Sequence, residues 1–251
     1  MDNRKKWVYN LLYRNSALET FVSQKETNRD ELCRFICQQL PRHHLIQLLE
    51  GIEVAFKNSD NHLKDTFKHV PLAGPGPQLH HYTVQEALLG LQSDESFEVS
   101  NYSTRPAGGH YALIRAGSLL MTTSVVTKDK AQPNSAKYRR EFSAINERLE
   151  AQHLDLFQSA TPPLGPNDDS LHALLLPYTA KWTEGDHSSP LGVVVAVPFS
   201  DPNAGFHLRI SSDELLQYYD EIDGFGDIAY PKLRASMRRD EERDQNEGGS
   251  E

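Results

Sequence analysis

Histidine is the residue type in this chain that is best suited to chemistry, and the chain contains eleven. Imidazole titrates near neutral pH and binds zinc, so grouped histidines indicate acid–base or metal sites. Four of them form the adjacent pairs His43-His44 and His80-His81. Neighbouring residues on a helix or strand point in different directions, which argues against a shared site for either pair. We therefore predict no bound metal and no cofactor.

The two cysteines, Cys33 and Cys37, precede the first histidine pair and give the spacing C-x3-C-x5-H with His43. Pro41 interrupts the geometry that zinc would need. Cysteine on an apolar helical stripe is usually a small buried hydrophobe, so both are predicted to be core residues. A count of two also excludes a disulfide framework and fits a reducing compartment, for which we predict a cytoplasm of the bacterial type.

A second histidine pattern consists of His81-x-Thr83 and His187-x-Ser189, and it resembles the paired motif of the two-histidine phosphoesterases. In that family both motifs lie on strands that converge. Here one motif falls at a predicted helix start and the other falls in a polar loop. Three-residue motifs also arise easily by chance, so the pattern does not predict that activity.

Three further histidines, His110, His172 and His207, each lie in a predicted strand. If strand pairing brought two of them together, they could line a pocket for a metal- or histidine-dependent hydrolase or nuclease. The simpler interpretation is that they are ordinary sheet residues with one hydrogen-bonded ring nitrogen.

An aromatic residue stands in a polar loop of the second half of the chain. We predict a partner-binding surface there, formed by Tyr178, Lys181, Trp182 and Asp186. Tryptophan beside charged loop residues is typical of a binding hot spot. The alternative is that Trp182 folds back over the end of the sheet.

These residues must be positioned by a sheet built around a β-hairpin at His110 to Val126. The two arms alternate in the way of strands, the second is rich in β-branched residues, and Gly117 can close the turn. Two runs, Leu171 to Leu176 and Leu191 to Val197, are continuously apolar. This pattern predicts strands that are buried on both faces in the middle of a sheet. Two shorter runs, Phe97 to Tyr102 and Phe206 to Ile210, complete the expected strands.

Apolar residues at helical spacing predict that residues 1–70 form a helical module. The proline- and glycine-rich stretch that follows predicts a linker at 71–82. Residues 83–235 are then an α+β domain with an antiparallel or mixed sheet of about five strands covered by helices. Those helices are expected from Thr83, over Ser135 to His153, and after Ser211. The charged residues 236–251 are predicted to be a disordered tail.

The net charge of −9 argues against a broad nucleic-acid or membrane surface. No motif for nucleophilic catalysis or a phosphate cradle is present. We therefore predict an interaction or regulatory protein without catalytic activity that binds a protein partner, in the manner of an antitoxin or immunity protein that neutralises a basic partner. The alternatives are the hydrolase or nuclease, and a DNA-binding regulator that uses the N-terminal helices.

Overall fold

The computed structural model describes residues 28–104, 109–130, 132–154, 170–183 and 185–223. Residues 28–39 are helical, and the further helices are α2 (Arg42–Thr66), α3 (Gly76–Leu89), α4 (Lys137–Ser143), η1 (Ala144–Asn146), α5 (Glu147–Leu154) and α6 (Ser212–Asp223). The strands are β1 (Phe97–Ser103), β2 (His110–Ala116), β3 (Leu119–Thr123), β4 (Val126–Thr127), β5 (Leu171–Thr179), β6 (Gly192–Pro198) and β7 (Phe206–Ser211). The α+β class is confirmed, with seven strands where about five were predicted. The predicted tail at 236–251 lies outside the described residues.

The sheet is mixed, with the strand order β1-β2-β3-β5-β6-β7 and β4 paired to β5. Strands β1 to β3 form one antiparallel meander and β5 to β7 form another. The two meanders join through the parallel pair β3 and β5, because the chain crosses over through α4, η1 and α5 between them. The crossover places β5 in the middle of the sheet.

The predicted hairpin is confirmed as β2 and β3, with Ala116 paired to Leu119 across the turn. Gly117 has a φ of 53°, a conformation that glycine adopts without steric cost. The amide oxygen of Gln39 accepts a hydrogen bond from the Ser118 backbone N–H at 2.7 Å. A Cβ at position 117 would lie 2.3 Å from that oxygen. Contact with Gln39, which ends the helix at residues 28–39, is therefore a second reason why this turn needs glycine.

The two apolar runs are confirmed as the paired central strands β5 and β6, with Leu175 opposite Val195. Both runs lack alternation because each face of the sheet is covered. Leu175 and Val195 belong to the main core, whereas Leu174 and Ala196 belong to a smaller cluster on the opposite face. A strand with apolar neighbours on both faces buries consecutive residues.

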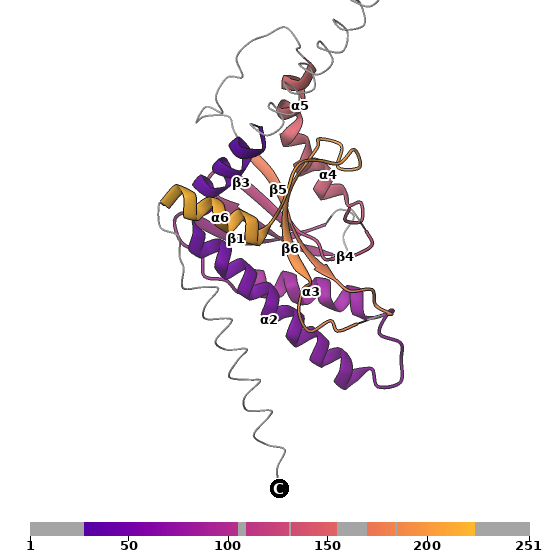
Figure 1. Cartoon of the computed structure of the whole chain (residues 1–251). Helices are drawn as coiled ribbons and strands as arrows, with labels where there is room; N and C mark the ends of the chain where they lie inside the picture. The colour runs from indigo at the N-terminus through magenta and orange to yellow at the C-terminus, as the bar shows by residue number, and fades with distance from the viewer. Residues whose placement is uncertain (1–27, 105–108, 131, 155–169, 184, 224–251) are drawn as a thin grey trace, which may run out of the picture.

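One core of buried side chains joins the helices to the sheet. Figure 1 shows the arrangement of these helices and strands. The core contains Leu48 and Ile52 of α2, Leu88 of α3, Leu215 of α6 and alternate residues of the strands such as Ile114. Helices α2, α3 and α6 therefore cover the same face. The helical segment and the sheet, predicted as separate modules, are buried against each other.

The other face carries the crossover helices. Tyr138 of α4 stacks flat on Tyr111 of β2 at 3.9 Å, and the ring of Phe142 lies 5.5 Å from that of His172. The helix predicted over Ser135 to His153 is broken by η1. In η1 the buried side chain of Asn146 accepts a hydrogen bond from the backbone N–H of His172 at 3.0 Å and donates one to the backbone carbonyl of His172 at 2.9 Å. The short 3-10 turn places this amide against the backbone of β5.

The helix start predicted at Thr83 is wrong, because α3 begins at Gly76 within the stretch predicted as a linker. Pro77 lies in its first turn, where a missing N–H breaks no helical hydrogen bond. Thr83 stands in mid-helix, and its hydroxyl donates to the Leu79 carbonyl at 2.8 Å. The helix cap predicted at Ser211 is confirmed, because the Ser211 hydroxyl accepts a hydrogen bond from the Glu214 N–H of α6 at 3.1 Å.

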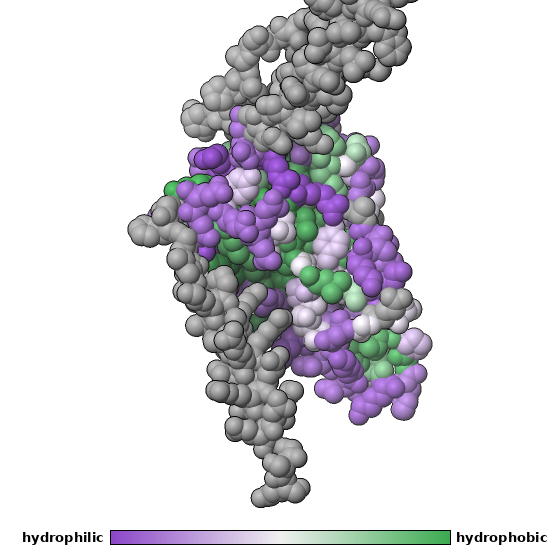
Figure 2. Space-filling model, viewed as in Figure 1, coloured by the Kyte–Doolittle hydropathy of each residue, from purple (hydrophilic) through white to green (hydrophobic). Residues whose placement is uncertain are grey.

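No helix in the described ranges combines the length and the apolar character needed to cross a bilayer. The face drawn in Figure 2 is largely hydrophilic, and hydrophobic side chains reach it in separate patches.

Candidate functional site

The four residues predicted to bind a partner lie at the end of β5 and in the loop after it, because Tyr178, predicted as a loop residue, belongs to β5. Tyr178, Lys181 and Asp186 are engaged with neighbouring side chains. The Tyr178 hydroxyl accepts a hydrogen bond from Arg209 at 2.6 Å, and Lys181 Nζ lies 3.6 Å from the Asp129 carboxylate. Asp186 accepts from both the N–H and the hydroxyl of Ser188, and these hydrogen bonds hold the pKa of its carboxyl below the usual range. Whether the four residues also bind a partner stays a prediction.

Trp182 lies over the end of the helical layer. Its ring stacks on His187 at 4.2 Å and meets the edge of His80 at 4.8 Å. It also passes so close to Gly76 that an added Cβ there would lie 2.2 Å from the indole carbon Cζ3. The tryptophan therefore closes the gap between the loop after β5 and the N-terminus of α3.

Beneath Trp182 lies a buried hydrogen-bonded network. His80 Nε2 donates to the His187 carbonyl at 2.9 Å, and His80 Nδ1 lies 2.8 Å from the Ser59 hydroxyl. Burial lowers the pKa of His80 and of His187, which favours the neutral form of both rings. With the proton on Nε2, the Nδ1 of His80 accepts the Ser59 proton. Ser59 is buried, and the network fixes the loop to α2 and α3.

We expect Gly76→Ala to destabilise the protein by about 1–3 kcal/mol, because the stacked Trp182 ring has no room to move away from the new methyl group. Chemical unfolding at equilibrium measures this change. The matched control is Gly192→Ala, whose Cβ would meet nothing within 4 Å and which should change stability by less than about 0.5 kcal/mol. Equal effects at the two positions, or an unchanged cost of Gly76→Ala in a Trp182→Ala background, would contradict the packing described.

The three strand histidines lie apart. His110 is exposed on β2, His172 is buried on β5, and His207 lies on β7 beside Phe199. One strand intervenes between β2 and β5, and another between β5 and β7. Neighbouring strands are about 4.8 Å apart, so His172 is separated from His110 and from His207 by roughly 10 Å across the sheet, and His110 and His207 are about twice as far apart. The three side chains do not line one pocket.

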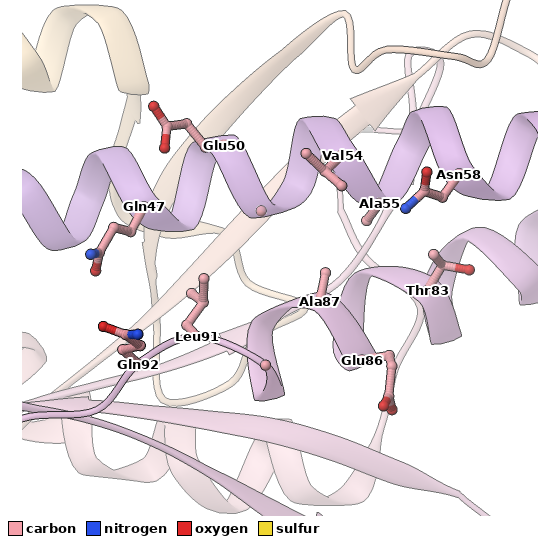
Figure 3. A pocket seen from close by; sticks show the side chains of 12 residues that line it. Gln47, Glu50, Val54, Ala55, Asn58, Thr83, Glu86, Ala87, Leu91 and Gln92 are labelled. Carbon is pink, nitrogen blue, oxygen red and sulfur yellow. The ribbon is translucent and has the colours of Figure 1, made fainter.

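The described residues form an open groove between α2 and α3 (Figure 3). Its volume is about 530 Å³, and it is open to the surface. The lining residues come from α2, from α3 and from the start of the loop after α3: Gln47, Glu50, Gly51, Val54, Ala55, Asn58, Thr83, Glu86, Ala87, Gly90, Leu91 and Gln92.

Small residues make the groove. Gly51 and Ala55 of α2 and Ala87 of α3 line it, and Ala87 and Leu91 point toward α2 in Figure 3. A Cβ at Gly51 would lie 3.6 Å from Leu91. Glycine and alanine leave space where larger side chains would fill the gap between the two helices. Val54 adds an apolar side chain that is 56% exposed. The floor of the groove is therefore apolar, with Gly51 and Ala87 partly exposed and Ala55 buried.

Two carboxylates border this floor. Glu50 extends from α2 and Glu86 from α3, in opposite directions away from the gap (Figure 3). Both are exposed, and neither has an ion-pair partner among the described residues. The lining contains no lysine, arginine or histidine. The groove thus has an apolar floor, and each of its two outer edges carries one exposed carboxylate.

The sequence did not predict this groove. The available signal was the spacing of small residues, with Gly51 and Ala55 four apart and Ala87 and Gly90 three apart on their helices. Such spacing places small residues on one helix face. It does not show which two helices meet, so the acidic border could not be assigned.

Within the described ranges, one group of side chains could offer three ligand atoms to a metal: His43, His44 and Asp94. Gln47 lies between this group and the groove, because it lines the groove and its Oε1 is 3.1 Å from His44 Nδ1. The adjacent histidine rings, predicted to point apart, have centroids 3.9 Å from each other.

Comparison with known proteins gave no match to this chain, whether with family models, curated proteins or solved structures.

Proposed function

We propose that this chain is a protein-interaction protein that holds a basic, amphipathic helical segment of a partner in the groove between α2 and α3. The observation that carries the proposal is the apolar floor at Gly51, Ala55 and Ala87 beside the unpaired carboxylates of Glu50 and Glu86. An amphipathic helix binds such a groove by burying its apolar face.

The apolar floor and the carboxylates contribute differently. Burying apolar side chains against the floor supplies most of the affinity, at roughly 25 cal/mol for each Å² removed from water. Exposed ion pairs to Glu50 and Glu86 add only about 0.2–1 kcal/mol each. They select a basic over an acidic partner, and with the net charge of −9 they speed the encounter.

The preference for a basic partner supports the role of an inhibitor in the manner of an antitoxin or immunity protein. An acidic protein that covers a basic surface competes directly with the nucleic acid or substrate that this surface would otherwise bind. A cytoplasmic site of action belongs to the same proposal. It is supported by the two cysteines, Cys33 and Cys37, which are free and buried in the core.

A defined peptide tests the groove directly. The probe is a labelled helical peptide of leucine and lysine at amphipathic spacing, and its counterpart carries glutamate in place of lysine. Fluorescence anisotropy with the full chain should show binding of the lysine peptide only. The variant Glu50→Lys with Glu86→Lys turns two attractions into repulsions and should weaken binding about tenfold, which corresponds to 1.4 kcal/mol.

Two further variants separate the groove from general charge. Glu31→Lys with Glu221→Lys alters the net charge equally at exposed positions outside the groove, and should weaken binding less than about twofold. Ala87→Leu fills the floor without changing the charge, and should weaken binding as strongly as the charge reversal. The proposal fails if the two charge-reversed variants bind alike, or if filling the floor has no effect.

A further inference from the structure

A second site lies at the N-terminus of α2, next to the groove. His43 and His44 are in the first turn of this helix, and Asp94 stands in the loop between α3 and β1. One nitrogen from each imidazole and one carboxylate oxygen lie within 4.8 Å of one another. We propose that these three side chains bind a divalent first-row transition metal of the zinc class.

The His44 ring is held in one orientation by its surroundings. It is 2% exposed, and Phe97 stacks on it at 4.3 Å with an interplanar angle of 10°. Its Nδ1 lies 3.1 Å from the Gln47 amide oxygen, so Nδ1 carries the proton and donates it there. Metal-binding histidines usually donate their second ring nitrogen to such an acceptor, which orients the ring and leaves the other nitrogen free for the metal.

The free nitrogen of His44 faces the Asp94 carboxylate. Nε2 lies 2.9 Å from Asp94 Oδ2, yet this buried nitrogen makes no hydrogen bond of acceptable geometry. A nitrogen lone pair and a carboxylate oxygen repel at that separation unless a cation lies between them. A proton with poor hydrogen-bond geometry satisfies this pair less well than a metal ion that both atoms coordinate.

Asp94 is oriented independently of His44. Its Oδ1 accepts hydrogen bonds from the backbone N–H groups of Ser96 at 2.7 Å and Phe97 at 2.9 Å. These bonds leave Oδ2 directed at the histidine. Because the first turn of a helix carries partial positive charge, the Asp94 carboxylate is also needed to offset the unfavourable field for a cation.

The ligand types define the class of metal. Two imidazole nitrogens and one carboxylate oxygen suit zinc, cobalt, nickel and ferrous iron better than calcium or magnesium, which prefer oxygen ligands alone. His43 and Asp94 are exposed, so a bound ion would keep at least one position toward solvent.

Cobalt(II) is the probe for the test, because its visible absorption reports its ligands and zinc displaces it. The full chain, freed of metal with a chelator, should bind one Co²⁺ whose spectrum is lost on adding Zn²⁺. Asp94→Asn keeps the oxygen that caps the loop but loses the charge, and His43→Ala removes an exposed ligand. Each should weaken Co²⁺ binding at least tenfold. The control His62→Ala removes an exposed histidine from the same helix and should bind as the wild type does.

A second measurement keeps the test independent of the spectrum. Zinc should raise the melting temperature of the wild type and of His62→Ala, and should raise it much less in Asp94→Asn, because a ligand stabilises the fold that binds it. No binding by the wild type, or equal binding by Asp94→Asn and His62→Ala, would overturn the proposal. Ala87→Leu should bind Co²⁺ normally, so failure of the metal site and failure of the peptide groove are distinguishable.

Discussion

Lowering the pH from 7 to 4 is expected to reduce the free energy of unfolding by about 3 kcal/mol through His172 alone. Burial, and next the nearby positive charge of Arg139, lower the pKa of His172 to about 3 from a usual value of 6.5. Between these two pH values His172 takes up a proton in the unfolded chain but stays largely neutral in the folded chain. The stabilising contribution is therefore complete above pH 6.5 and is lost as the pH falls toward 3.

Urea unfolding at a series of pH values measures this loss. In His172→Asn the free energy of unfolding should be lower at pH 7, because Phe142 and Thr122 lose their contacts with the ring, but its dependence on pH should flatten. The matched control is His110→Asn, which removes an exposed histidine and should keep the dependence of the wild type. Some dependence will remain in every variant, because burial also lowers the pKa of His80, His81 and His187. Parallel curves for the wild type and His172→Asn would contradict the assignment.

Replacing Phe56 by alanine is expected to cost about 3–5 kcal/mol of stability, which is a large share of the roughly 5–15 kcal/mol of a typical domain. Phe56 is completely buried on the inner side of α2, and its ring meets the edge of His80 at 4.8 Å. The substitution leaves a cavity where α2, α3 and the Trp182 loop come together. Equilibrium denaturation of the full chain measures the loss.

Two controls define the cause of that loss. Phe56→Leu keeps most of the apolar volume and should cost about 1 kcal/mol. Val54→Ala lies two residues away on the outer side of the same helix, where the side chain is 56% exposed, and should change stability by less than about 0.5 kcal/mol. A cost at Val54 comparable to that at Phe56 would mean that α2 is buried on a different face from the one described.

Much of the fold could be predicted because its signals are local. The turn at Gly117, the alternation in β2 and β3, and the unbroken apolar runs of β5 and β6 each depend on residues within one short segment. Errors arose where local patterns competed. The sequence from Thr83 matches a capping box, but the helix starts at Gly76 because Pro77 suits a first turn and the network of Ser59 and His80 places this turn against α2.

The histidines show why the sites were harder to predict than the strands. His43 and His44 were set aside because neighbours on a helix point apart, yet their rings lie 3.9 Å from each other and share Asp94, which is fifty residues further along the chain. His80 reaches the carbonyl of His187 across an even longer stretch of sequence. No spacing rule connects residues this distant.

The sequence by itself determined the α+β class, the hairpin and the buried central strands, because the periodicity of apolar residues follows directly from backbone geometry. Only the tertiary structure decided that α2 packs beside α3 and that the loop after α3 returns to the start of α2. Those contacts depend on how side chains of separate elements fit together, which is a property of the assembled core. The groove with Glu50 and Glu86, and the cluster of His44 with Asp94, exist only as a result of that packing.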